Sequence, residues 1–449
     1  MLLLQGKSRG GAEWEMGMLV VLIAAVFEAG FAVFCICTQS NQQKIRGMVR
    51  IGAFAVFVIF TLVSVIEWGF QWIALAFLLL IWALLGLWTL LRRKEKHKVY
   101  KWGRVIGRAV IMFILVIIAA APAIVFPQYR LPQVTGEYEV ATKTYTYIDK
   151  NRIEEFSDTG ANRFVNVEFW YPENANGTYP LLVFSHGAYG IKSSNTSTYQ
   201  ELASHGYVVC SIDHPYHSFY TVSEGGQVTI ASQKFMNEFG NANKDGVYSV
   251  QEIYGLRQKW MKLRTDDMNF VIDTILEKAK SDSDKVYQLV NPEKIGVFGH
   301  SMGGAASAWL GRERHDVTAV VNIDGPLFSD IVYNKEKNNF ESTHQAYKIP
   351  LLNIYSDSVW QQLDSISTYA GNKTVEESGG EVYKVYIRGA KHMSLTDLSL
   401  FSPMLADMLQ GGRAKIDKYK CLETMNRIIL EFFDSYLKGK GSFTSAGTY

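Results

Sequence analysis

A serine between two glycines is the residue best suited to chemistry in this 449-residue sequence. Residues 299–303 read Gly-His-Ser-Met-Gly, with Ser301 at the centre of a Gly-x-Ser-x-Gly pattern. In that pattern the serine occupies a strained turn between a strand and a helix, where small neighbours permit tight backbone approach and leave the hydroxyl exposed. The pattern is weak alone, but the longer segment GVFGHSMGGAASAWL predicts a strand before the turn and a helix after it. We therefore predict that Ser301 is a nucleophile.

The base that would activate this serine is expected on its carboxyl-terminal side. A nucleophilic serine needs a base, and the base needs an orienting carboxylate. In strand-turn-helix sites of this type the acid and then the histidine follow the serine. Three histidines follow Ser301; His315 and His344 lie in polar segments, whereas His392 follows a predicted strand in GAKHMSLTD. A loop after the last strand can reach the nucleophile, which favours His392.

Two aspartates compete for the role of orienting acid. Asp324 ends the predicted strand VTAVVNID, and Asp357 ends the predicted strand PLLNIYSD. The carboxyl ends of parallel strands share one edge of a sheet, so both aspartates are expected on the edge that carries Ser301. The residues by themselves leave this choice open.

An oxyanion formed at the serine would need two backbone N–H donors. Met302, directly after the nucleophile, is expected to supply one. The other is expected from Ala188 in LLVFSHGAYG, where Gly187 leaves room for the oxyanion. We interpret His186 in the same loop as a structural hydrogen-bonding residue rather than a second base.

A metal site is not predicted. His214 and His217 in DHPYH have spacing found in metal sites, but no third ligand accompanies them, and we interpret the loop as stabilising the sheet edge. No Cys-x-x-Cys pair or His/Cys cluster indicates zinc. Since acyl transfer through a serine requires no cofactor, none is expected.

The elements that must hold these residues alternate between strand and helix after residue 130. Several runs are continuously apolar, which is typical of strands buried on both faces of a parallel sheet. Ser249 and Glu252 have capping-box spacing at the start of a long helix that ends near Lys280. The alternation predicts an α/β sheet with helices on both faces. The predicted strands span residues 164–172, 180–187, 207–213, 294–300, 317–325, 350–357 and 381–389.

The stretch from about Thr135 to Lys438 resembles the platelet-activating-factor acetylhydrolase-like family of α/β-hydrolases, the plasma type and its bacterial relatives. The resemblance implies an α/β-hydrolase fold over 131–449, a serine esterase without a cofactor, and Asp324 rather than Asp357 as the acid. It also matches Ala188 and Met302 to the oxyanion donors. An insertion at about 218–262, rich in Tyr, Phe and Asn, is expected to form a lid. The motifs that carry the resemblance are RFVNVEFWYP, LLVFSHGAYG, SHGYVVCSIDHP, RTDDMNFVIDTI, GVFGHSMGGAA, VVNIDGPLF and RGAKHMSLTD.

The first 130 residues differ from that pattern, because they contain four apolar stretches. Each is close to the roughly 20 residues that a membrane-spanning helix needs, so residues 1–130 are expected to form an all-α transmembrane bundle. Glu28, near the middle of the first stretch, is expected to face the bundle interior, because a lipid-facing carboxylate is costly. The predicted spans are 17–38, 48–66, 72–91 and 105–126.

Charge predicts the orientation of these spans. The loop at 92–104 carries seven Lys and Arg residues, and the loop at 44–50 carries three more. By the positive-inside rule both loops are cytoplasmic, which predicts a multi-pass protein of the cell membrane with an extracytoplasmic domain after residue 130. That domain has 31 Lys and Arg against 38 Asp and Glu, which argues against nucleic-acid binding.

The combined prediction is a membrane-anchored serine hydrolase whose partners are the lipid bilayer and a small-molecule or lipid ester. Phospholipids with short or oxidised acyl chains are candidate substrates. Two alternatives stay open: the same residues could transfer the acyl group to an alcohol, or the domain could be an inert binding module on a membrane bundle. The sequence indicates no protein partner.

Overall fold

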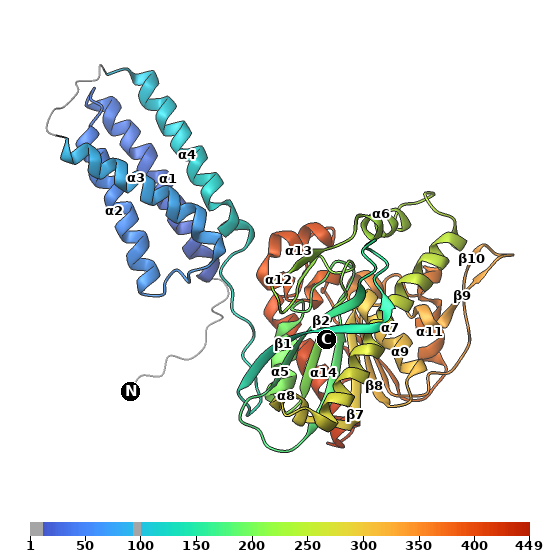
Figure 1. The fold of residues 1–449 in the computed structure, drawn as a ribbon. Coiled ribbons are helices and arrows are strands. Elements are labelled where there is room, and N and C mark those ends of the chain that lie inside the picture. The colour runs from blue at the N-terminus through green and yellow to red at the C-terminus, as the bar shows by residue number, and fades with distance from the viewer. Residues whose placement is uncertain (1–11, 93–99) are drawn as a thin grey trace. The chain divides into compact units, whose positions relative to one another are not determined.

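The computed structural model describes residues 12–92 and 100–449, and the chain divides into two compact units (Figure 1). The first unit contains Met1–Arg130 and Leu400–Leu405, and the second contains Leu131–Ser399 and Ala406–Tyr449. In Figure 1 the colour follows the residue number, and the described helices of residues 12–130 are drawn in blue to cyan.

Among the described residues of the first unit, three helices are long and apolar enough to cross a membrane; they cover Gln43–Leu62, Phe70–Leu91 and Trp102–Val125. Of the predicted first span, 17–38, the side chains of residues 17–21, 24 and 25 lie outside the described ones. The apolar part that can be judged, Val26–Cys37, is shorter than a span, so a fourth span stays a prediction. The helices of this unit are α1 (Ala12–Cys37), α2 (Gln43–Leu62), η2 (Phe70–Trp72), α3 (Ile73–Leu91) and α4 (Trp102–Val125).

The predicted second span, 48–66, is displaced from α2, which begins five residues earlier at Gln43 and ends at Leu62. The first turn of α2 contains polar residues, which are helical but not apolar, so a hydropathy pattern does not include them. At the other end, Ser64 adopts a left-handed φ of 56°, which stops the helix inside the apolar stretch.

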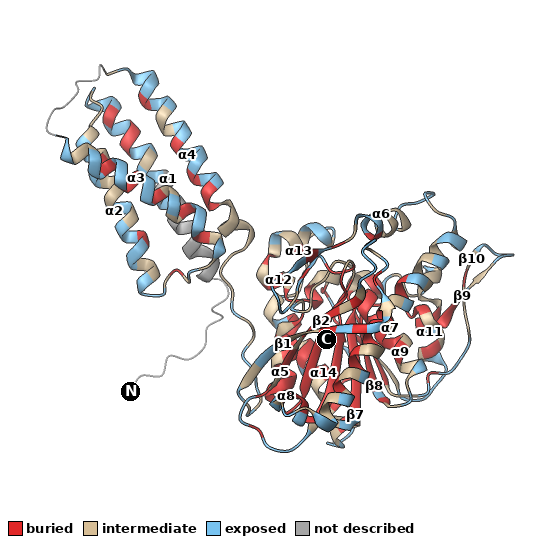
Figure 2. Cartoon of the chain, in the orientation of Figure 1, coloured by how far each residue is buried: buried red, intermediate tan, exposed pale blue. Residues whose placement is uncertain are grey.

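The close packing at glycine and the exposed apolar side chains of the first unit are typical of helices in an apolar environment such as a lipid bilayer. A Cβ on Gly86 of α3 would lie 2.7 Å from the carbonyl oxygen of Gly47 on α2, so these helices pack closely at glycine, as membrane helices do. Large apolar side chains point outward; Phe77 is 64% exposed and Ile118 is 63% exposed. In Figure 2 the pale blue of exposed residues runs along the described helices of this unit. An apolar surface of this extent is unfavourable in water.

The second unit is built on a nine-stranded sheet in the order β1-β2-β4-β3-β7-β8-β11-β12-β13. Strands from β4 to β13 run parallel, whereas β2 is antiparallel to both β1 and β4. Strands β4 and β11 are buried along their whole length, and β7 is buried from Ile295 to His300, as their continuous apolar runs predict (Figure 2). The strands are β1 (Val140–Ile153), β2 (Asn162–Pro172), β3 (Tyr179–Ser185), β4 (Val208–Asp213), β7 (Val290–His300), β8 (Val317–Ile323), β11 (Leu351–Tyr355), β12 (Val382–Tyr386) and β13 (Gly447–Thr448).

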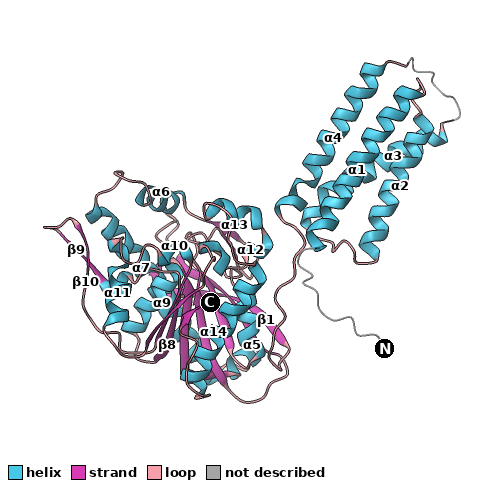
Figure 3. Ribbon diagram, turned by 180° about the vertical axis from the view of Figure 1, so that it is seen from behind, coloured by secondary structure: helices cyan, strands magenta, loops and turns pink. Residues whose placement is uncertain are grey.

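Helices cover both faces of the sheet. Figures 1 and 3, which view the chain from opposite sides, show α7 and α9 on one face and α5 and α14 on the other. Ser249 and Glu252 form the predicted capping box at the start of α7, and Gly439, with φ 66°, ends α14. The helices are α5 (Thr196–Ser204), α6 (Gln233–Ala242), α7 (Val250–Ser281), α8 (Lys285–Gln288), α9 (Met302–Glu313), α10 (Asp357–Trp360), α11 (Ala370–Glu377), α12 (Leu398–Phe401), α13 (Pro403–Leu409) and α14 (Lys418–Lys438).

Two regions differ from what the apolar patterns predict. The 14-residue strand β1 has no predicted counterpart; it is an edge strand whose residues are partly polar, because one face is exposed. The expected insertion, 218–262, contains the hairpin of β5 (Tyr220–Val222) and β6 (Val228–Ile230), then α6 and the first turns of α7. A second hairpin joins β9 (Ile331–Asn334) and β10 (Asn339–Ser342).

Candidate active site

Ser301 occupies the turn between β7 and α9, as the Gly-x-Ser-x-Gly pattern predicts. Its backbone, at φ 55° and ψ −121°, is in a region that residues with a side chain rarely adopt. The Ser301 N–H donates a hydrogen bond of 2.7 Å to the carbonyl of Ile323, at the end of β8. A Cβ on Gly303 would collide with the Ser185 carbonyl, so glycine is required for this close approach. The turn leaves Ser301 partly exposed at the carboxyl edge of the sheet.

His392 and Asp324 lie together at the same edge. His392 begins a short 3-10 turn, η5 (His392–Leu395), after β12, and its Nδ1 lies 2.7 Å from Oδ2 of Asp324. Asp324 directly follows β8 and also accepts hydrogen bonds of 2.7 Å from the N–H and the hydroxyl of Ser356. The carboxylate is fully buried, whereas the imidazole is 31% exposed. Since Nδ1 faces the carboxylate, Nε2 is the nitrogen available to exchange a proton.

His392 also contacts His300, the residue directly before the serine. The His300 and His392 rings lie 4.4 Å apart, and Nε2 of His300 donates to the His392 carbonyl at 3.0 Å. Within the described residues no hydrogen bond joins the Ser301 hydroxyl to His392. Such bonds are often long in unliganded hydrolases and tighten when substrate binds.

Asp357, the competing acid, is engaged elsewhere. Its Oδ1 accepts hydrogen bonds from the Tyr386 hydroxyl at 2.6 Å and from the Gly389 N–H at 2.8 Å. Asp357 thereby caps the end of β12 and stabilises the loop that leads to His392. The geometry thus favours Asp324 over Asp357 as the partner of the imidazole.

In the described part of the chain, neither predicted oxyanion donor is used in a hydrogen bond. Among the described residues, the N–H groups of Ala188 and Met302 have no acceptor. The loop that carries Ala188 lies against the nucleophile, since a Cβ on Gly187 would be 3.3 Å from the Cβ of Ser301. Free N–H groups beside a serine can stabilise the charge of a tetrahedral intermediate.

A buried polar cluster behind the Ala188 loop escaped the sequence analysis. Arg264 on α7 donates to the carbonyls of His186 and Gly187, the latter at 3.2 Å. One helical turn later, Asp267 receives two hydrogen bonds from the buried Arg163. The motif RTDDMNFVIDTI contains Arg264 and Asp267, but charged residues in a helix normally indicate an exposed face, so the sequence alone gave no reason to place them in the core.

This cluster contains a second Ser-His-Asp arrangement. The Ser185 hydroxyl lies 2.9 Å from Nε2 of His214, whose Nδ1 lies 3.0 Å from Oδ2 of Asp267. All three side chains are fully buried, so no substrate can reach Ser185. His214 uses both ring nitrogens in these contacts, and the His217 ring stacks on Phe235 with the ring centroids 3.8 Å apart, so both histidines contact other side chains of the protein. His186 is likewise a structural residue, with hydrogen bonds from both nitrogens.

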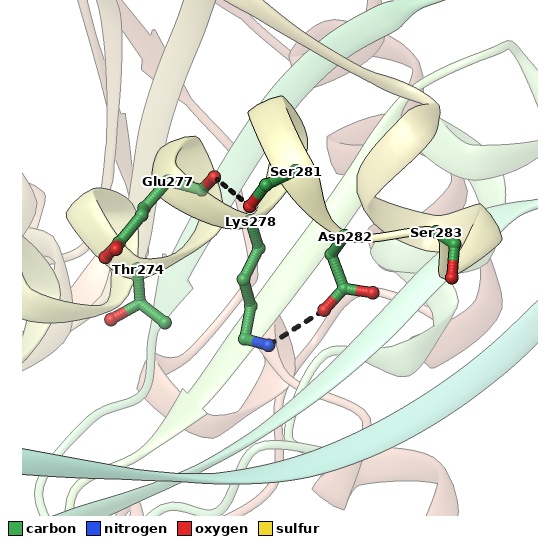
Figure 4. Close-up of a pocket in the computed structure, with 6 residues that line it drawn as sticks. All are labelled: Thr274, Glu277, Lys278, Ser281, Asp282 and Ser283. Carbon is green, nitrogen blue, oxygen red and sulfur yellow. Dashed lines mark hydrogen bonds and ion pairs between the residues drawn. The ribbon is translucent and has the colours of Figure 1, made fainter.

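A surface pocket at the end of α7 is separate from these residues. It is lined by Thr274, Glu277, Lys278, Ser281, Asp282 and Ser283 (Figure 4). Two of its charged groups pair with each other, since Nζ of Lys278 lies 2.9 Å from Asp282. None of the six residues belongs to the candidate site.

The sequence matches the family model of platelet-activating factor acetylhydrolase, isoform II, over residues 161–446. The chain belongs to this family. The resemblance inferred from the sequence is thereby confirmed, and Ala188, Ser301, Met302, Asp324 and His392 all lie inside the region that matches this acetylhydrolase family.

Individual relatives are distant. The platelet-activating factor acetylhydrolase of Bos taurus is 22% identical over 275 residues, which is 58% of this chain and 57% of that relative. A probable 1-alkyl-2-acetylglycerophosphocholine esterase of Arthroderma benhamiae is 24% identical over 163 residues, 35% of this chain and 34% of that relative. The chain thus spans less than two thirds of the length of the acetylhydrolases that it matches.

A solved structure similar to this family member supports the fold. A ferulic acid esterase from Streptomyces cinnamoneus superposes with a TM-score of 0.54 and 20% identity, covering 69% of this chain and 93% of that one. The predicted α/β-hydrolase fold is confirmed by this likeness together with the strand order.

The buried histidines of this acetylhydrolase-family domain predict sensitivity to acid. Burial and the charge of Arg264 hold the pKa of His217 well below its ordinary value, so the folded chain keeps it neutral. Below about pH 6.5 this histidine binds a proton in the unfolded chain but stays neutral in the folded chain. The free energy of unfolding therefore falls, as the pH is lowered, by up to about 1.4 kcal/mol per pH unit for each such histidine. We expect His217→Phe to keep the stacking on Phe235 and to reduce the loss of melting temperature between pH 7.5 and pH 5.

The measurement is thermal unfolding of the detergent-solubilised protein at the two pH values. His315→Gln, at an exposed position, is the control for removing a histidine. An acid-induced loss as large in His217→Phe as in the wild type would contradict the prediction.

Proposed function

We propose that this chain is a membrane-anchored serine ester hydrolase that uses Ser301, His392 and Asp324. The observation that carries the proposal is the Asp324–His392 contact of 2.7 Å at the sheet edge that bears the Ser301 turn. Family membership supports it, because the relatives described above are named acetylhydrolase and esterase.

The proposed reaction begins when Nε2 of His392 accepts the proton of the Ser301 hydroxyl. The serine oxygen attacks the ester carbonyl, and the negative charge forms between the N–H groups of Ala188 and Met302. His392 then gives its proton to the leaving alcohol, which departs and leaves an acyl-serine. Water, deprotonated by the same imidazole, releases the acid and restores the serine. Asp324 holds the imidazole in the required tautomer and stabilises its charged form throughout.

The proposed substrates are lipid-derived or other amphipathic esters with a short acyl group. The support is chemical and positional: one matched relative is named a probable 1-alkyl-2-acetylglycerophosphocholine esterase, a name that contains a short-acyl phospholipid, and this domain follows helices that are able to cross a membrane. The assay compares purified protein on p-nitrophenyl acetate, on a 2-acetyl phospholipid and on a long-chain phospholipid, in mixed micelles. We expect cleavage of the first two. Cleavage of the nitrophenyl ester with no phospholipid hydrolysis would refute the lipid substrate alone.

We also propose that the hydrolase domain lies outside the cytoplasm. The support is the cationic loop at 92–104, of which residues 93–99 lie outside the described ones, together with the cations at 44–50. In intact cells, a membrane-impermeant fluorophosphonate is expected to label the protein as strongly as it does after lysis. Labelling that requires lysis would contradict this orientation.

A further inference from the structure

We infer that Arg264 is a positioning residue that orients and polarises the Ala188 N–H as an oxyanion donor. The inference rests on the proposed function and extends it to a side chain that touches neither the serine nor its base.

The contacts of Arg264 converge on the peptide group that contains this N–H. Its guanidinium donates to the carbonyls of His186 and Gly187 and, at 3.3 Å, to the Ser185 hydroxyl. The Gly187 carbonyl belongs to the same peptide group as the Ala188 N–H. It also lies 2.6 Å from Nδ1 of His186, which must be the donor because a carbonyl can only accept.

Two donors on one carbonyl determine the direction of the N–H on the other side of the bond. A trans peptide is planar, and its C=O and N–H point in opposite directions. With Arg264 and His186 holding the carbonyl toward the core, the Ala188 N–H must face away from them. Gly187, whose carbonyl is held in this way, is next to the nucleophile, because a Cβ built on it would lie 3.3 Å from the Cβ of Ser301. The donor is therefore fixed before substrate arrives and needs no reorganisation during the reaction.

The charge of Arg264 adds an electrostatic effect to the geometric one. The side chain is fully buried, and its hydrogen bonds within the described residues go to two carbonyls and one hydroxyl, not to a carboxylate. The buried acid one helical turn later, Asp267, is already paired with Arg163, Arg152 and His214. Burial lowers the pKa of Arg264 to about 9, so the group stays cationic at neutral pH. A cation on the carbonyl side withdraws electron density from the peptide and makes its N–H a stronger donor.

A purely structural role would not require this residue. Burying an incompletely paired cation costs several kcal/mol, and an apolar side chain of similar volume would often fill the same space at least as well. The Nε of Arg264 even lacks an acceptor among the described residues. An arginine at this position is explained if the site needs a positive charge directed at the oxyanion loop.

The test measures transition-state stabilisation separately from substrate binding. Arg264→Met removes the charge and the donors while retaining a long side chain. Loss of one oxyanion donor typically lowers kcat by about 100-fold or more. For p-nitrophenyl acetate we expect kcat to fall about 100-fold with KM changed less than about threefold. The inhibition constant of a trifluoromethyl ketone, which adds to the serine as an oxyanion-bearing hemiketal, should rise by a similar factor. Parallel losses in kcat and inhibitor affinity are not expected from a general loss of packing.

Arg257→Met is the matched control. Arg257 lies on the same helix seven residues earlier, donates to the Thr368 hydroxyl at 3.2 Å and lies over the Phe328 and Phe340 rings. We expect all three constants of this variant to remain within about threefold of the wild type, because it does not contact the oxyanion loop.

Arg264→Lys keeps the inference testable if Arg264→Met does not fold. Lysine retains the charge but cannot direct a planar fork at two carbonyls, so we expect about a tenfold loss of kcat at a nearly unchanged melting temperature. Wild-type kcat and ketone affinity in either folded variant would overturn the inference. Failure of the proposed function gives a different result, because the wild type itself would then show no ester hydrolysis that depends on Ser301.

Discussion

Ser301→Ala is expected to lower kcat/KM for ester hydrolysis by about 10⁴-fold or more and to abolish labelling by a fluorophosphonate. The hydroxyl at the turn between β7 and α9 would form the bond to the acyl group, and an alanine has no atom that could replace it. The oxyanion donors would survive the substitution because they are backbone groups, so weak residual activity should remain. The measurements are steady-state hydrolysis of p-nitrophenyl acetate and in-gel fluorescence of the labelled protein.

Ser185→Ala is the matched control for this substitution. Ser185 has the same kind of hydrogen-bonded connection, to His214 and Asp267, but its hydroxyl is buried away from solvent. We expect the variant to be labelled, with stability lower by about 1–3 kcal/mol because His214 loses a buried partner. Labelling that survives in Ser301→Ala and disappears in Ser185→Ala would show that the wrong serine has been assigned.

Asp324→Asn is expected to lower kcat by about 10⁴-fold with little change in fold. The amide is nearly isosteric with the carboxylate, but it carries no charge to stabilise the protonated imidazole. It can also present its NH₂ group to Nδ1 of His392, which would favour the tautomer with its proton on Nε2. That tautomer cannot accept the proton of Ser301. Stopped-flow or steady-state hydrolysis of p-nitrophenyl acetate measures the loss.

Asp357→Asn tests whether the second aspartate is the acid instead. An asparagine carbonyl can still accept the hydrogen bonds from Tyr386 and Gly389, so we expect kcat within about threefold of the wild type. A large loss in Asp357→Asn combined with near-normal activity in Asp324→Asn would reverse the assignment.

Local sequence patterns predicted much of the candidate site because they specify backbone conformation over a few residues. Glycines around Ser301 predicted the turn that β7 and α9 form, and capping-box spacing predicted the start of α7 at Ser249. Continuous apolar runs located the central strands to within a few residues. The predicted strand ends at 187, 325 and 357 overshot β3, β8 and β11 by two residues each, because the chain leaves the sheet where the site loops begin.

The sequence alone determined the residue types and the local turns. It has a serine on a tight turn, a histidine after the last predicted strand, and apolar stretches long enough to span a bilayer. Tertiary structure decided which of these groups meet. It brings Asp324 rather than Asp357 to His392 across 68 residues, and it places Arg264 on a carbonyl 77 residues away. The physical reason is that a pattern of neighbouring residues fixes φ and ψ locally, whereas a hydrogen bond between distant residues depends on how strands and helices pack.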